Sequence, residues 1–435
     1  MWNSCWPAAG KHKGNYMVEL NIENLGARGD GIAHDDDGVI YVPYAVPGDR
    51  VAATIKGRRG DARVAQLDTV LVAGADRVAA PCPHFTICGG CAMQHVQAGP
   101  YQRWKLDILL QALGHRDLET DTVENFVTVP PASRRRARFA ARHTGGKVLL
   151  GFNEPGSHKI VNLESCSILR PAIVDVLPEL RAALRDLLKS GDKADVQITE
   201  TENGLDVWLV AKLRHNAQVD MRLADFAQTA DLARLSTGLR PEVVMVRRTP
   251  KVTLSGVAVT PPPDGFLQAS KAGEQALVKL VQQGVGDART VADLYAGVGT
   301  FSFAMGGISS GRVDVMAVEG VEEQTAALIA GRNAARRNGI DIQVRDLERR
   351  PLSVEELAAY QAVVFDPPRA GAARQVELLA AAEVATVVAV SCNPATFARD
   401  ALMLVEGGYR MLSVTPVDQF PWSRHLELVA CFQRR

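Results

Sequence analysis

Hydrophobic and polar residues follow two different patterns along this chain, and each pattern predicts a different kind of domain. Between residues 17 and 74, apolar and polar positions alternate with a period of two, as in Val18-Glu19-Leu20-Asn21-Ile22. This period is typical of strands with one buried face. Further short runs occur at Val39–Val42, Val51–Ile55 and Val64–Leu71. Short strands with glycine turns predict a small β-barrel, and residues 1–16 are expected to form a loose extension.

From about residue 263 the pattern changes to alternating helices and strands. The expected strands are Thr290–Leu294, Val313–Val318, Ile342–Val344, Ala362–Phe365, Val384–Val390 and Arg410–Pro416. The expected helices are Ser270–Gln282, Glu322–Asn338, Ala372–Ala382 and Ala395–Glu406. This alternation predicts an α/β, Rossmann-like domain over residues 263–435, with a doubly wound and mostly parallel sheet.

The residues between these two regions predict a central α+β domain over 75–262. Strands are expected at Leu205–Leu213 and Val243–Arg247, with helices at Tyr101–Leu113 and Val174–Lys189. A chain of 435 residues is also too long for a single core of ordinary size, which favours two or three domains.

Three of the predicted strands are followed by reactive or ligand-binding residues. One is followed by Ser391-Cys392-Asn393-Pro394-Ala395-Thr396, another by Asp366-Pro367-Pro368-Arg369, and a third opens a glycine-rich loop from Asp293 to Thr300. Ligands of open α/β sheets bind at the carboxyl ends of the strands. A thiol there, at Cys392, can act as a nucleophile instead of filling the core. The three strand ends therefore predict one site.

The glycine-rich loop has the features of a nucleotide-binding turn. Gly297 and Gly299 precede a helix expected to start near Thr300, and the next strand ends at Glu319, about twenty residues on. Glycines let a ligand approach the backbone, and a carboxylate at Glu319 can accept from both ribose hydroxyls. The missing third glycine counts against NAD. The alternative is a tight turn beside a solvated glutamate.

A cysteine-rich segment predicts a metal site. Cys82, Cys88 and Cys91 lie close together around Gly89-Gly90, and Cys166 follows much later. Four thiolates suit a tetrahedral zinc ion or an iron–sulfur cluster, and their spacing leaves these two open. The alternative is that the cysteines only fill the core.

A basic stretch and a carboxylate near the end are further candidates. Ser133-Arg134-Arg135-Arg136-Ala137-Arg138 and Arg142 predict a strand with one basic face, which suits phosphate contacts or is simply solvated. His425-Leu426-Glu427 precedes an apolar strand, so Glu427 is either a general base or a surface residue.

Net charge and hydropathy restrict the partners and the location that the sequence predicts. The formal net charge is zero, so no overall field directs the protein to nucleic acid or membrane, and any polyanion must meet local patches. No apolar stretch approaches a membrane span or a signal-peptide core, which predicts a cytoplasmic location and no membrane partner. Seven cysteines in such a chain indicate metal binding or catalysis, not disulfides.

From about Met17 to its end the chain resembles the RNA uracil-5 methyltransferases, which use S-adenosylmethionine. The motifs that carry the resemblance are Phe266-Leu267-Gln268, Asp293–Phe301, Asp366-Pro367-Pro368-Arg369, Ser391–Thr396 with Ala398-Arg399-Asp400, and His425-Leu426-Glu427. Two positions depart from the family pattern, because Thr300 and Ser270 stand where asparagine is common.

The resemblance extends to one branch of the family. The cysteines resemble those of members with a four-iron–four-sulfur cluster, which makes Cys82, Cys88, Cys91 and Cys166 its expected ligands. The first barrel resembles a TRAM domain. Both features are similar to the enzyme that methylates a uridine in 23S ribosomal RNA, and the tRNA branch typically lacks them. The helix near Tyr101–Leu113 is expected to pack on the catalytic domain.

The resemblance also implies roles for individual residues. Cys392 would add to carbon 6 of uracil, Glu427 would remove the carbon-5 proton, and Asp366 would hold the polar edge of the base. Cys392 must ionise near neutral pH or lose its proton as it attacks, and the helix that begins near Ala395 is expected to favour its thiolate. The expected cofactor residues are Gln268, Tyr295, Gly297, Gly299, Thr300, Glu319, Asp346 and Asp366. The expected RNA contacts are Arg134, Arg136, Arg138 and Arg369.

Other functions remain as alternatives. They are a tRNA uridine-5 methyltransferase, an RNA cytosine-5 methyltransferase, a non-catalytic RNA-binding protein and, on the glycine loop alone, an NAD-dependent oxidoreductase. We expect a monomer that binds RNA and not DNA. Cys5 and Cys431 receive no role.

Overall fold

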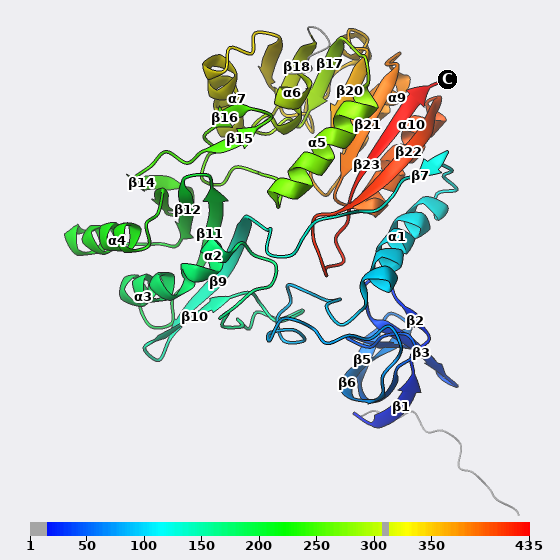
Figure 1. Ribbon diagram of the computed structural model, residues 1–435, viewed down its shortest axis with the longest axis vertical. Helices are drawn as coiled ribbons and strands as arrows, with labels where there is room; N and C mark the ends of the chain where they lie inside the picture. The colour runs from blue at the N-terminus through cyan, green and yellow to red at the C-terminus, as the bar shows by residue number, and fades with distance from the viewer. Residues whose placement is uncertain (1–14, 307–312) are drawn as a thin grey trace, which may run out of the picture. The chain divides into compact units, whose positions relative to one another are not determined.

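The computed structural model describes residues 15–306 and 313–435 (Figure 1). Cys5 and nearly all of the predicted extension lie outside these residues. The chain divides into two compact units. The first comprises Met1–Ala80, as far as it is described, with Ala92–Trp104; the second comprises Pro81–Cys91 and Lys105–Arg435. The boundary predicted at residue 263 therefore lies inside the second unit.

The first unit is built on a six-stranded sheet with the order β1-β5-β6-β4-β3-β2. Its strands are β1 (Met17–Asn21), β2 (Asn24–Leu25), β3 (Gly31–Asp35), β4 (Gly38–Val42), β5 (Arg50–Arg59) and β6 (Ala62–Val72). Alternate residues such as Ile40, Val51 and Ala53 are buried, as the period of two predicted. Because β1 and β2 lie at opposite ends of the strand order, closure into a TRAM-like barrel stays a prediction.

The second unit contains a central sheet with the order β10-β9-β11-β12-β13-β14. Its strands are β9 (Arg136–Thr144), β10 (Lys147–Gly151), β11 (Lys193–Thr201), β12 (Gly204–Val210), β13 (Arg234–Thr237) and β14 (Glu242–Val246). Helices α2 (Pro171–Asp175), α3 (Leu177–Leu187) and α4 (Ala217–Thr229) accompany it. The basic strand is confirmed: Arg138 and Arg142 are exposed, whereas Phe139 and Ala141 are buried.

One helix of this region was predicted wrongly. The apolar pattern from Val174 to Lys189 suggested a single helix, but the structure has two, α2 and α3, which meet at Val176. Pro178 lies in the first turn of α3. A proline lacks the backbone N–H that a continuous helix would need there.

The second unit also contains a nine-stranded sheet with the order β19-β18-β17-β20-β21-β23-β22-β7, and with β8 paired to β22. Its strands are β7 (Thr122–Val123), β8 (Val127–Thr128), β17 (Thr290–Leu294), β18 (Asp314–Glu319), β19 (Ile340–Val344), β20 (Ala362–Phe365), β21 (Thr386–Ser391), β22 (Tyr409–Asp418) and β23 (Glu427–Arg434). The pairs from β19 to β21 are parallel, whereas β23 is antiparallel to β21 and β22.

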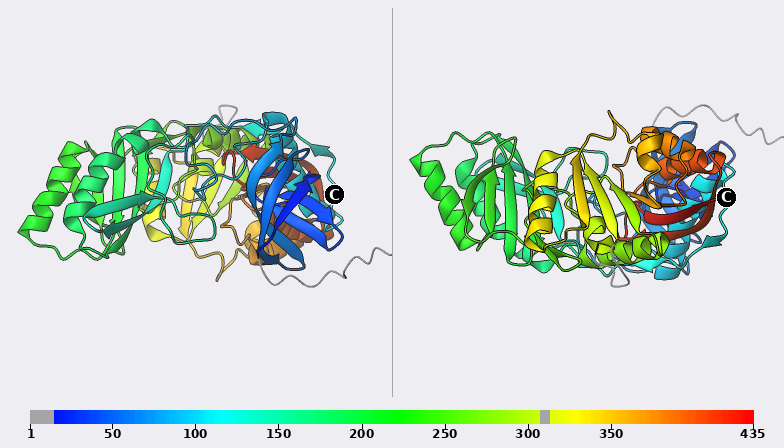
Figure 2. Two further views of the ribbon diagram at one scale, coloured as in Figure 1. Left: turned by 90° about the horizontal axis from the view of Figure 1, so that it is seen from below. Right: turned by 90° about the horizontal axis from the view of Figure 1, so that it is seen from above.

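Helices cover both faces of this sheet, as Figure 2 shows for α5 on one side and α9 and α10 on the other. The helices are α1 (Ala98–Gly114), α5 (Lys271–Val285), α6 (Thr300–Met305), α7 (Glu322–Ala334), α8 (Val354–Leu357), α9 (Ala373–Ala381) and α10 (Pro394–Glu406). Neighbouring residues of β20 face opposite cores: Val363 packs with the α9 and α10 side, and Val364 with the α5 side. The predicted doubly wound sheet is confirmed.

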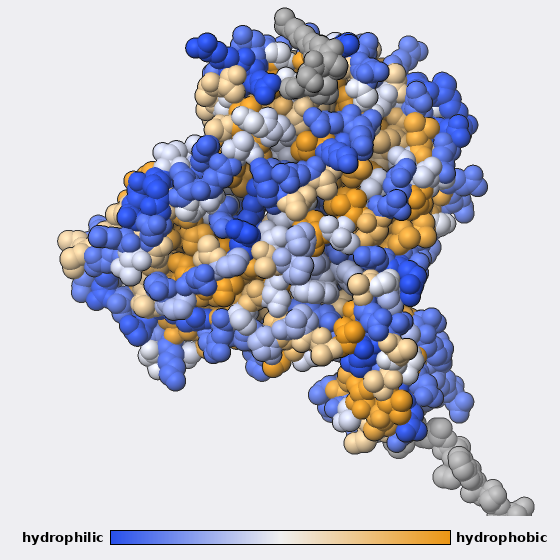
Figure 3. All heavy atoms as spheres, in the orientation of Figure 1, coloured by the Kyte–Doolittle hydropathy of each residue, from blue (hydrophilic) through white to orange (hydrophobic). Residues whose placement is uncertain are grey.

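The second half of α1 belongs to the same core. Leu109 and Leu113 pack into the apolar cluster that contains α9 and α10. A hairpin of β15 (Val252–Leu254) and β16 (Val257–Val259) joins the opposite cluster. In the described part of the chain, no helix combines the length and apolarity that crossing a bilayer requires. Hydrophilic residues predominate on the face seen in Figure 3, with apolar ones in small groups between them.

Candidate active site

Strand order brings the predicted strand ends together. Strands β17, β20 and β21 are consecutive neighbours, so the glycine loop, Asp366 and Cys392 follow three adjacent carboxyl ends. Strand β23 runs the other way, and its Leu428 pairs with Ser391 of β21. The first residue of β23, Glu427, therefore lies at the same edge of the sheet, beside Cys392.

These residues surround one cavity of about 530 Å³. The candidate reacting groups Cys392, Asp366 and Glu427 line it together with the candidate cofactor residues Tyr295, Gly297 and Glu319. The remaining lining residues are Arg134, Phe266, Val321, Gln324, Pro367, Pro368, Arg369, Phe420 and His425. Gln268, Gly299, Thr300 and Asp346 are not among the lining residues, so the cavity holds only part of the predicted cofactor set.

A chain of amide side chains joins the two acids. Gln268 Nε2 donates to Asp366 Oδ2 at 3.0 Å, and Gln419 Nε2 donates to Gln268 Oε1 at 2.9 Å. The same Gln419 nitrogen donates to Glu427 Oε2 at 2.6 Å. Gln268, Gln419 and Glu427 are all buried. Gln268 therefore acts from behind the cavity, through Asp366.

Burial shifts the protonation of both acids. It raises the pKa of Asp366 to about 7, against a hydrogen bond from Gln268 that lowers it. Burial and then the charge of Asp366 raise the pKa of Glu427 to about 8, whereas Gln419 and Arg369 lower it. Two interacting acids titrate as a pair. The pair therefore takes up and releases protons near neutral pH.

The thiol of Cys392 departs from expectation. Asn393 caps α10 through a bond from the Ala395 N–H, but the helix does not leave Cys392 as a thiolate. Burial, followed by the charges of Glu427 and Asp366, raises its pKa to about 11, and Arg369 opposes them only in part. The helix end does not suffice to ionise Cys392 near neutral pH, because desolvation and two carboxylates outweigh it. Of the two expected routes, loss of the proton during attack fits this raised pKa.

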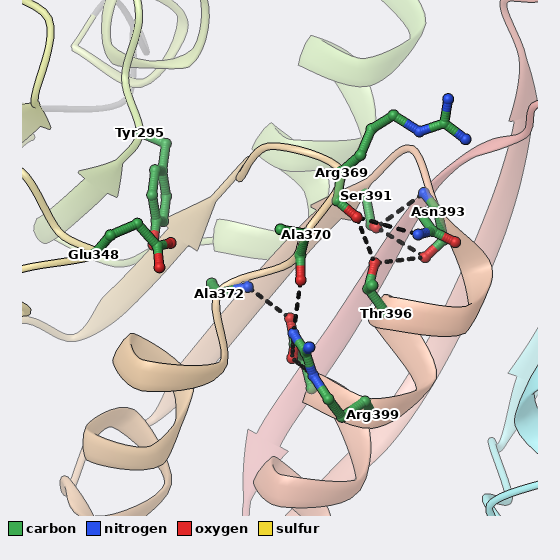
Figure 4. A network of polar contacts seen from close by, with 10 residues as sticks. Tyr295, Glu348, Arg369, Ala370, Ala372, Ser391, Asn393, Thr396 and Arg399 are labelled. Carbon is green, nitrogen blue, oxygen red and sulfur yellow. Dashed lines mark hydrogen bonds and ion pairs between the residues drawn. The ribbon is translucent and has the colours of Figure 1, made fainter.

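Backbone contacts fix the two motif loops to each other (Figure 4). The carbonyl oxygen of Arg369 accepts from Asn393 Nδ2 at 3.1 Å and lies 3.2 Å from the Thr396 hydroxyl. Ser391 and Asn393 also bond to each other. The Arg369 guanidinium extends away from these contacts in Figure 4, and its Nη2 lies 3.2 Å from His425 Nδ1.

The Ala398-Arg399-Asp400 segment has a supporting role. Arg399 Nη2 donates to the carbonyl of Ala370 at 3.0 Å, and Asp400 Oδ2 accepts from the Ala372 N–H at 2.8 Å. Between them Gly371 has a φ of +81°, and a Cβ there would lie 2.4 Å from the Arg399 guanidinium. These contacts close the loop that follows Asp366 onto α10.

The glycine loop is shaped for close approach. Tyr295 has a φ of +62°, an unusual backbone conformation for a bulky residue and one that clusters at ligand sites. Glu319 accepts from the backbone N–H groups of Gly297 and Val321, each at 2.8 Å. Both carboxylate oxygens are thereby held in place beside the cavity, and each keeps a lone pair for a hydroxyl donor.

Two other residues of the glycine loop, Gly299 and Asp293, have structural positions. Gly299 has a φ of +99°, and a Cβ there would lie 2.2 Å from Leu328, so it allows α6 to pack on α7. Asp293 is fully buried, accepts from the Ser302 hydroxyl and leaves Oδ1 without a hydrogen-bond partner in the described residues. Burial raises its pKa to about 7. Asp346 instead caps a turn at the backbone of Glu348.

The four predicted RNA-contacting arginines differ in their partners. Arg134 and Arg369 line the cavity, and the Arg134 guanidinium lies 5.6 Å from the centre of the Phe420 ring. Arg136 donates to Gln197 and to the carbonyl of Asp264. Arg138 pairs with Asp195 at 2.8 Å, with both side chains about half exposed.

Three of the four candidate cluster cysteines, Cys82, Cys88 and Cys166, influence one another electrostatically. Burial and the charges of Cys166 and Cys82 raise the pKa of Cys88. Burial lowers the pKa of Arg134, whereas the charges of Cys166 and Cys91 raise it. Among residues 15–306 and 313–435, however, no group of three or more His, Cys, Asp or Glu side chains has a spacing suited to a metal ion.

Sequence reasoning missed the residues that hold the segment before Glu427. Lys105 of α1 is fully buried, forms an ion pair with Asp418 and donates to the carbonyls of Phe420 at 3.0 Å and His425 at 2.7 Å. Gln419 lies inside that segment. A lysine within an apolar helix pattern was the available signal for Lys105, but nothing in the sequence indicated its partners.

Comparisons with known proteins show the family of the chain. A family model described as tRNA (Uracil-5-)-methyltransferase matches residues 263–435. The chain is 40% identical, over 95% of its length, to an uncharacterized RNA methyltransferase of Agrobacterium fabrum, of which it covers 99%. It belongs to the RNA uracil-5 methyltransferase family. All the lining residues of the cavity except Arg134 lie within the matched segment.

Two further proteins are similar to nearly the whole chain. The 23S rRNA (uracil(1939)-C(5))-methyltransferase RlmD of Pectobacterium atrosepticum is 29% identical over 95% of this chain and 93% of its own length. The crystal structure of Pyrococcus abyssi tRNA (uracil-54, C5)-methyltransferase, in complex with S-adenosyl-L-homocysteine, superposes with a TM-score of 0.74. It shares 24% identity and covers 95% of this chain and 99% of its own. The shared fold is that of class I S-adenosylmethionine methyltransferases.

Proposed function

We propose that the protein methylates carbon 5 of a uridine in 23S ribosomal RNA, with S-adenosylmethionine as methyl donor. One observation carries the proposal: Cys392, Asp366 and Glu427 share a cavity with Tyr295, Gly297 and Glu319. A nucleophile, two acids and a nucleotide-type loop are thus available to the same pair of substrates. The match to RlmD along both chains supports ribosomal RNA, and with it action in the cytoplasm.

The residues of the cofactor side fit an adenosine ligand. Glu319 is held by two backbone N–H groups and keeps acceptor capacity for ribose hydroxyls. Gly297 has a φ of +57° and leaves room above the loop. S-adenosylmethionine would supply an electrophilic methyl group at this place.

The reacting side suits covalent activation of uracil. In the proposed reaction, Cys392 sulfur forms a bond to carbon 6, and the electrons of the 5,6 double bond move onto the enolate. Carbon 5 would then take the methyl group from the sulfonium, with S-adenosylhomocysteine as the leaving group, and lose its proton to Glu427. The carbon–sulfur bond breaks and the double bond re-forms. Covalent catalysis divides one difficult step into easier ones.

The raised pKa of Cys392, about 11, decides how the thiol reacts. A free thiolate is scarce at neutral pH, so we propose that the proton leaves as sulfur attacks, towards the Asp366–Glu427 pair. Asp366, with its pKa near 7, is then able to donate to the polar edge of the base as the enolate forms. A protonated acid avoids the repulsion that a second carboxylate would cause.

RNA reaches this site by its single-stranded parts. The target uridine must leave its stack, which costs a few kcal/mol and least in a loop. Arg134 and Arg369 at the cavity, with Arg136 and Arg138 on the basic strand, are proposed to hold the surrounding phosphates, and the first unit is proposed to add a TRAM-like contact.

A four-iron–four-sulfur cluster on Cys82, Cys88, Cys91 and Cys166 is part of the proposal. In such a cluster each cysteine binds a different iron, so the sulfurs need not converge as tightly as around one ion. Gly89 fits this tight loop, because a Cβ there would lie 2.8 Å from the Asn153 carbonyl. Iron and sulfide analysis of anaerobically purified protein tests it; stoichiometric zinc without sulfide would reject the cluster.

The covalent step is tested with RNA that contains 5-fluorouridine. Because fluorine at carbon 5 cannot leave as a proton, the adduct should persist through denaturing electrophoresis. Cys392→Ala should form none, whereas Cys431→Ala, which removes a thiol of the same sheet outside the cavity, should form it as the wild type does. An adduct with Cys392→Ala would overturn the proposed nucleophile.

The substrate is tested by mapping 5-methyluridine in 23S ribosomal RNA and tRNA from a deletion strain. Loss from 23S ribosomal RNA alone is expected. Loss from tRNA alone would replace the proposed substrate and leave the chemistry intact.

A further inference from the structure

Gln419 occupies a position between two acids that no sequence motif marked. It follows the last residue of β22 and is 2% exposed. Both N–H bonds of its amide are used, one towards Glu427 at 2.6 Å and one towards Gln268 at 2.9 Å. Since Gln268 donates onward to Asp366, the two amides present donors to a carboxylate at each end.

We propose that Gln419 is a positioning residue for Glu427, which orients this carboxylate and favours its ionised form, the form that accepts the carbon-5 proton. The inference rests on the proposed function, in which Glu427 is the base. A donated N–H stabilises a carboxylate relative to its acid. Of the other groups facing Glu427, Asp366 and Cys392 oppose its charge and Arg369 favours it.

Two neighbours keep the Gln419 amide in this place. Lys105 bonds to the residues on either side, Asp418 and Phe420. On α5, a Cβ at Gly273 would lie 2.9 Å from both Cβ and Oε1 of Gln419, so only glycine leaves enough room there.

The orientation of the amide also follows from its surroundings. Gln419 Oε1 is buried and has no hydrogen-bond partner among the described residues. The two Nε2 bonds therefore orient the group. Turning it would place an oxygen against Glu427, which is repulsive unless Glu427 carries a proton.

The test is Gln419→Met, which keeps the length of the side chain and removes both donors. Without the donated N–H, the pKa of Glu427 should rise, so less of the base is ionised at pH 7. Loss of one pKa unit of stabilisation corresponds to about a tenfold lower rate of product release at pH 7. The covalent RNA adduct should accumulate, and the rate deficit should shrink as the pH approaches about 9 because the whole profile moves by that unit.

A matched control separates this effect from general loss of a buried amide. Gln375 is 1% exposed, and its side-chain amide bonds to the backbone N–H and carbonyl of Leu352. Gln375→Met should change the rate equally at every pH or not at all. Gly273→Ala displaces Gln419 without removing it, and alanine otherwise favours a helix by about 1 kcal/mol; it should shift the profile in the same direction as Gln419→Met.

The outcomes distinguish the inference from the proposed function. An unshifted pH profile in folded Gln419→Met, with Glu427→Gln still trapping the adduct, would overturn only the role of Gln419. If Gln419→Met fails to fold, an unshifted profile in Gly273→Ala overturns it instead. Wild-type turnover by Glu427→Gln would remove the base, and with it both the proposed function of Glu427 and this inference.

Discussion

The two halves of the cavity hold their carboxylates in different ways. On the cofactor side, both oxygens of Glu319 accept from backbone N–H groups. On the reacting side, Asp366 and Glu427 each accept from one side-chain amide, and burial raises their pKa values to about 7 and about 8. Two main-chain donors hold the Glu319 carboxylate in one orientation for ligand binding. A single side-chain donor at Asp366 and at Glu427 leaves these two acids able to exchange protons near neutral pH.

The largest expected effect comes from the replacement of Glu427, the proposed base in the reacting half of the cavity. Glu427→Gln keeps the size of the side chain and removes its ability to accept the carbon-5 proton, so methylation should fall by about 10²–10⁴-fold. Denaturing gels should then show a trapped RNA–protein adduct that forms from ordinary RNA. Glu322→Gln, at the exposed start of α7, is the control. Loss of adduct as well as turnover would instead place Glu427 before the covalent step.

Removal of a buried cation should weaken the reacting half next. Lys105→Met leaves Asp418 buried without its ion-pair partner, and breaking such a pair costs about 3–5 kcal/mol of unfolding free energy. Chemical denaturation measures this loss. Lys279→Met, at an exposed position of α5, should change the stability by less than about 0.5 kcal/mol. Equal stability of the two variants would contradict a structural role for Lys105.

The raised pKa values of Asp366 and Glu427 predict a pH dependence of stability. Both folded-state pKa values lie above those of the unfolded chain, so the folded protein binds more protons between about pH 4 and pH 8. Stability should therefore decrease as the pH rises through this window. Asp366→Asn combined with Glu427→Gln should flatten the decrease. A decrease that is equally steep in the double variant would assign it to other groups.

The smallest effect concerns the cofactor half. In Glu319→Gln an NH₂ group must face the N–H of Gly297 or of Val321, so one loop contact becomes repulsive. We expect S-adenosylhomocysteine to bind about tenfold more weakly, which corresponds to about 1.4 kcal/mol, as calorimetry would measure. Because Asp366, Glu427 and Gln419 are unchanged, the pH profile of turnover should keep its midpoint. A shifted midpoint would mean that the two halves are not separate in their proton chemistry.

The sequence predicted the site where local pattern and sheet topology point to the same place. Cys392 and Asp366 follow apolar runs, and parallel strands bring their carboxyl ends to one edge. Glu427 was harder to place, because its strand runs antiparallel to β21. The pattern of apolar residues in a strand does not show in which direction the strand runs in the sheet. The same limit applies to β7 and β8, which are too short to show a period.

Other parts of the site could not be predicted because they depend on long-range contacts. Gln419 lies far along the chain from Gln268, and Lys105 is farther still from Asp418. The pKa of Cys392 could not be predicted either. The start of the following helix was visible in the sequence, but the burial and the two facing carboxylates that raise this pKa were not.

The position of Lys105 has a consequence for how the chain folds. The segment matched by the family model, 263–435, includes Asp418 but not its cation, and it lacks the edge strands β7 and β8. A fragment limited to that segment would bury Asp418 without this ion pair and expose a sheet edge. We therefore expect this fragment to fold less stably than the whole chain. During synthesis, its final strands complete a structure whose first part, in α1, was made more than three hundred residues earlier.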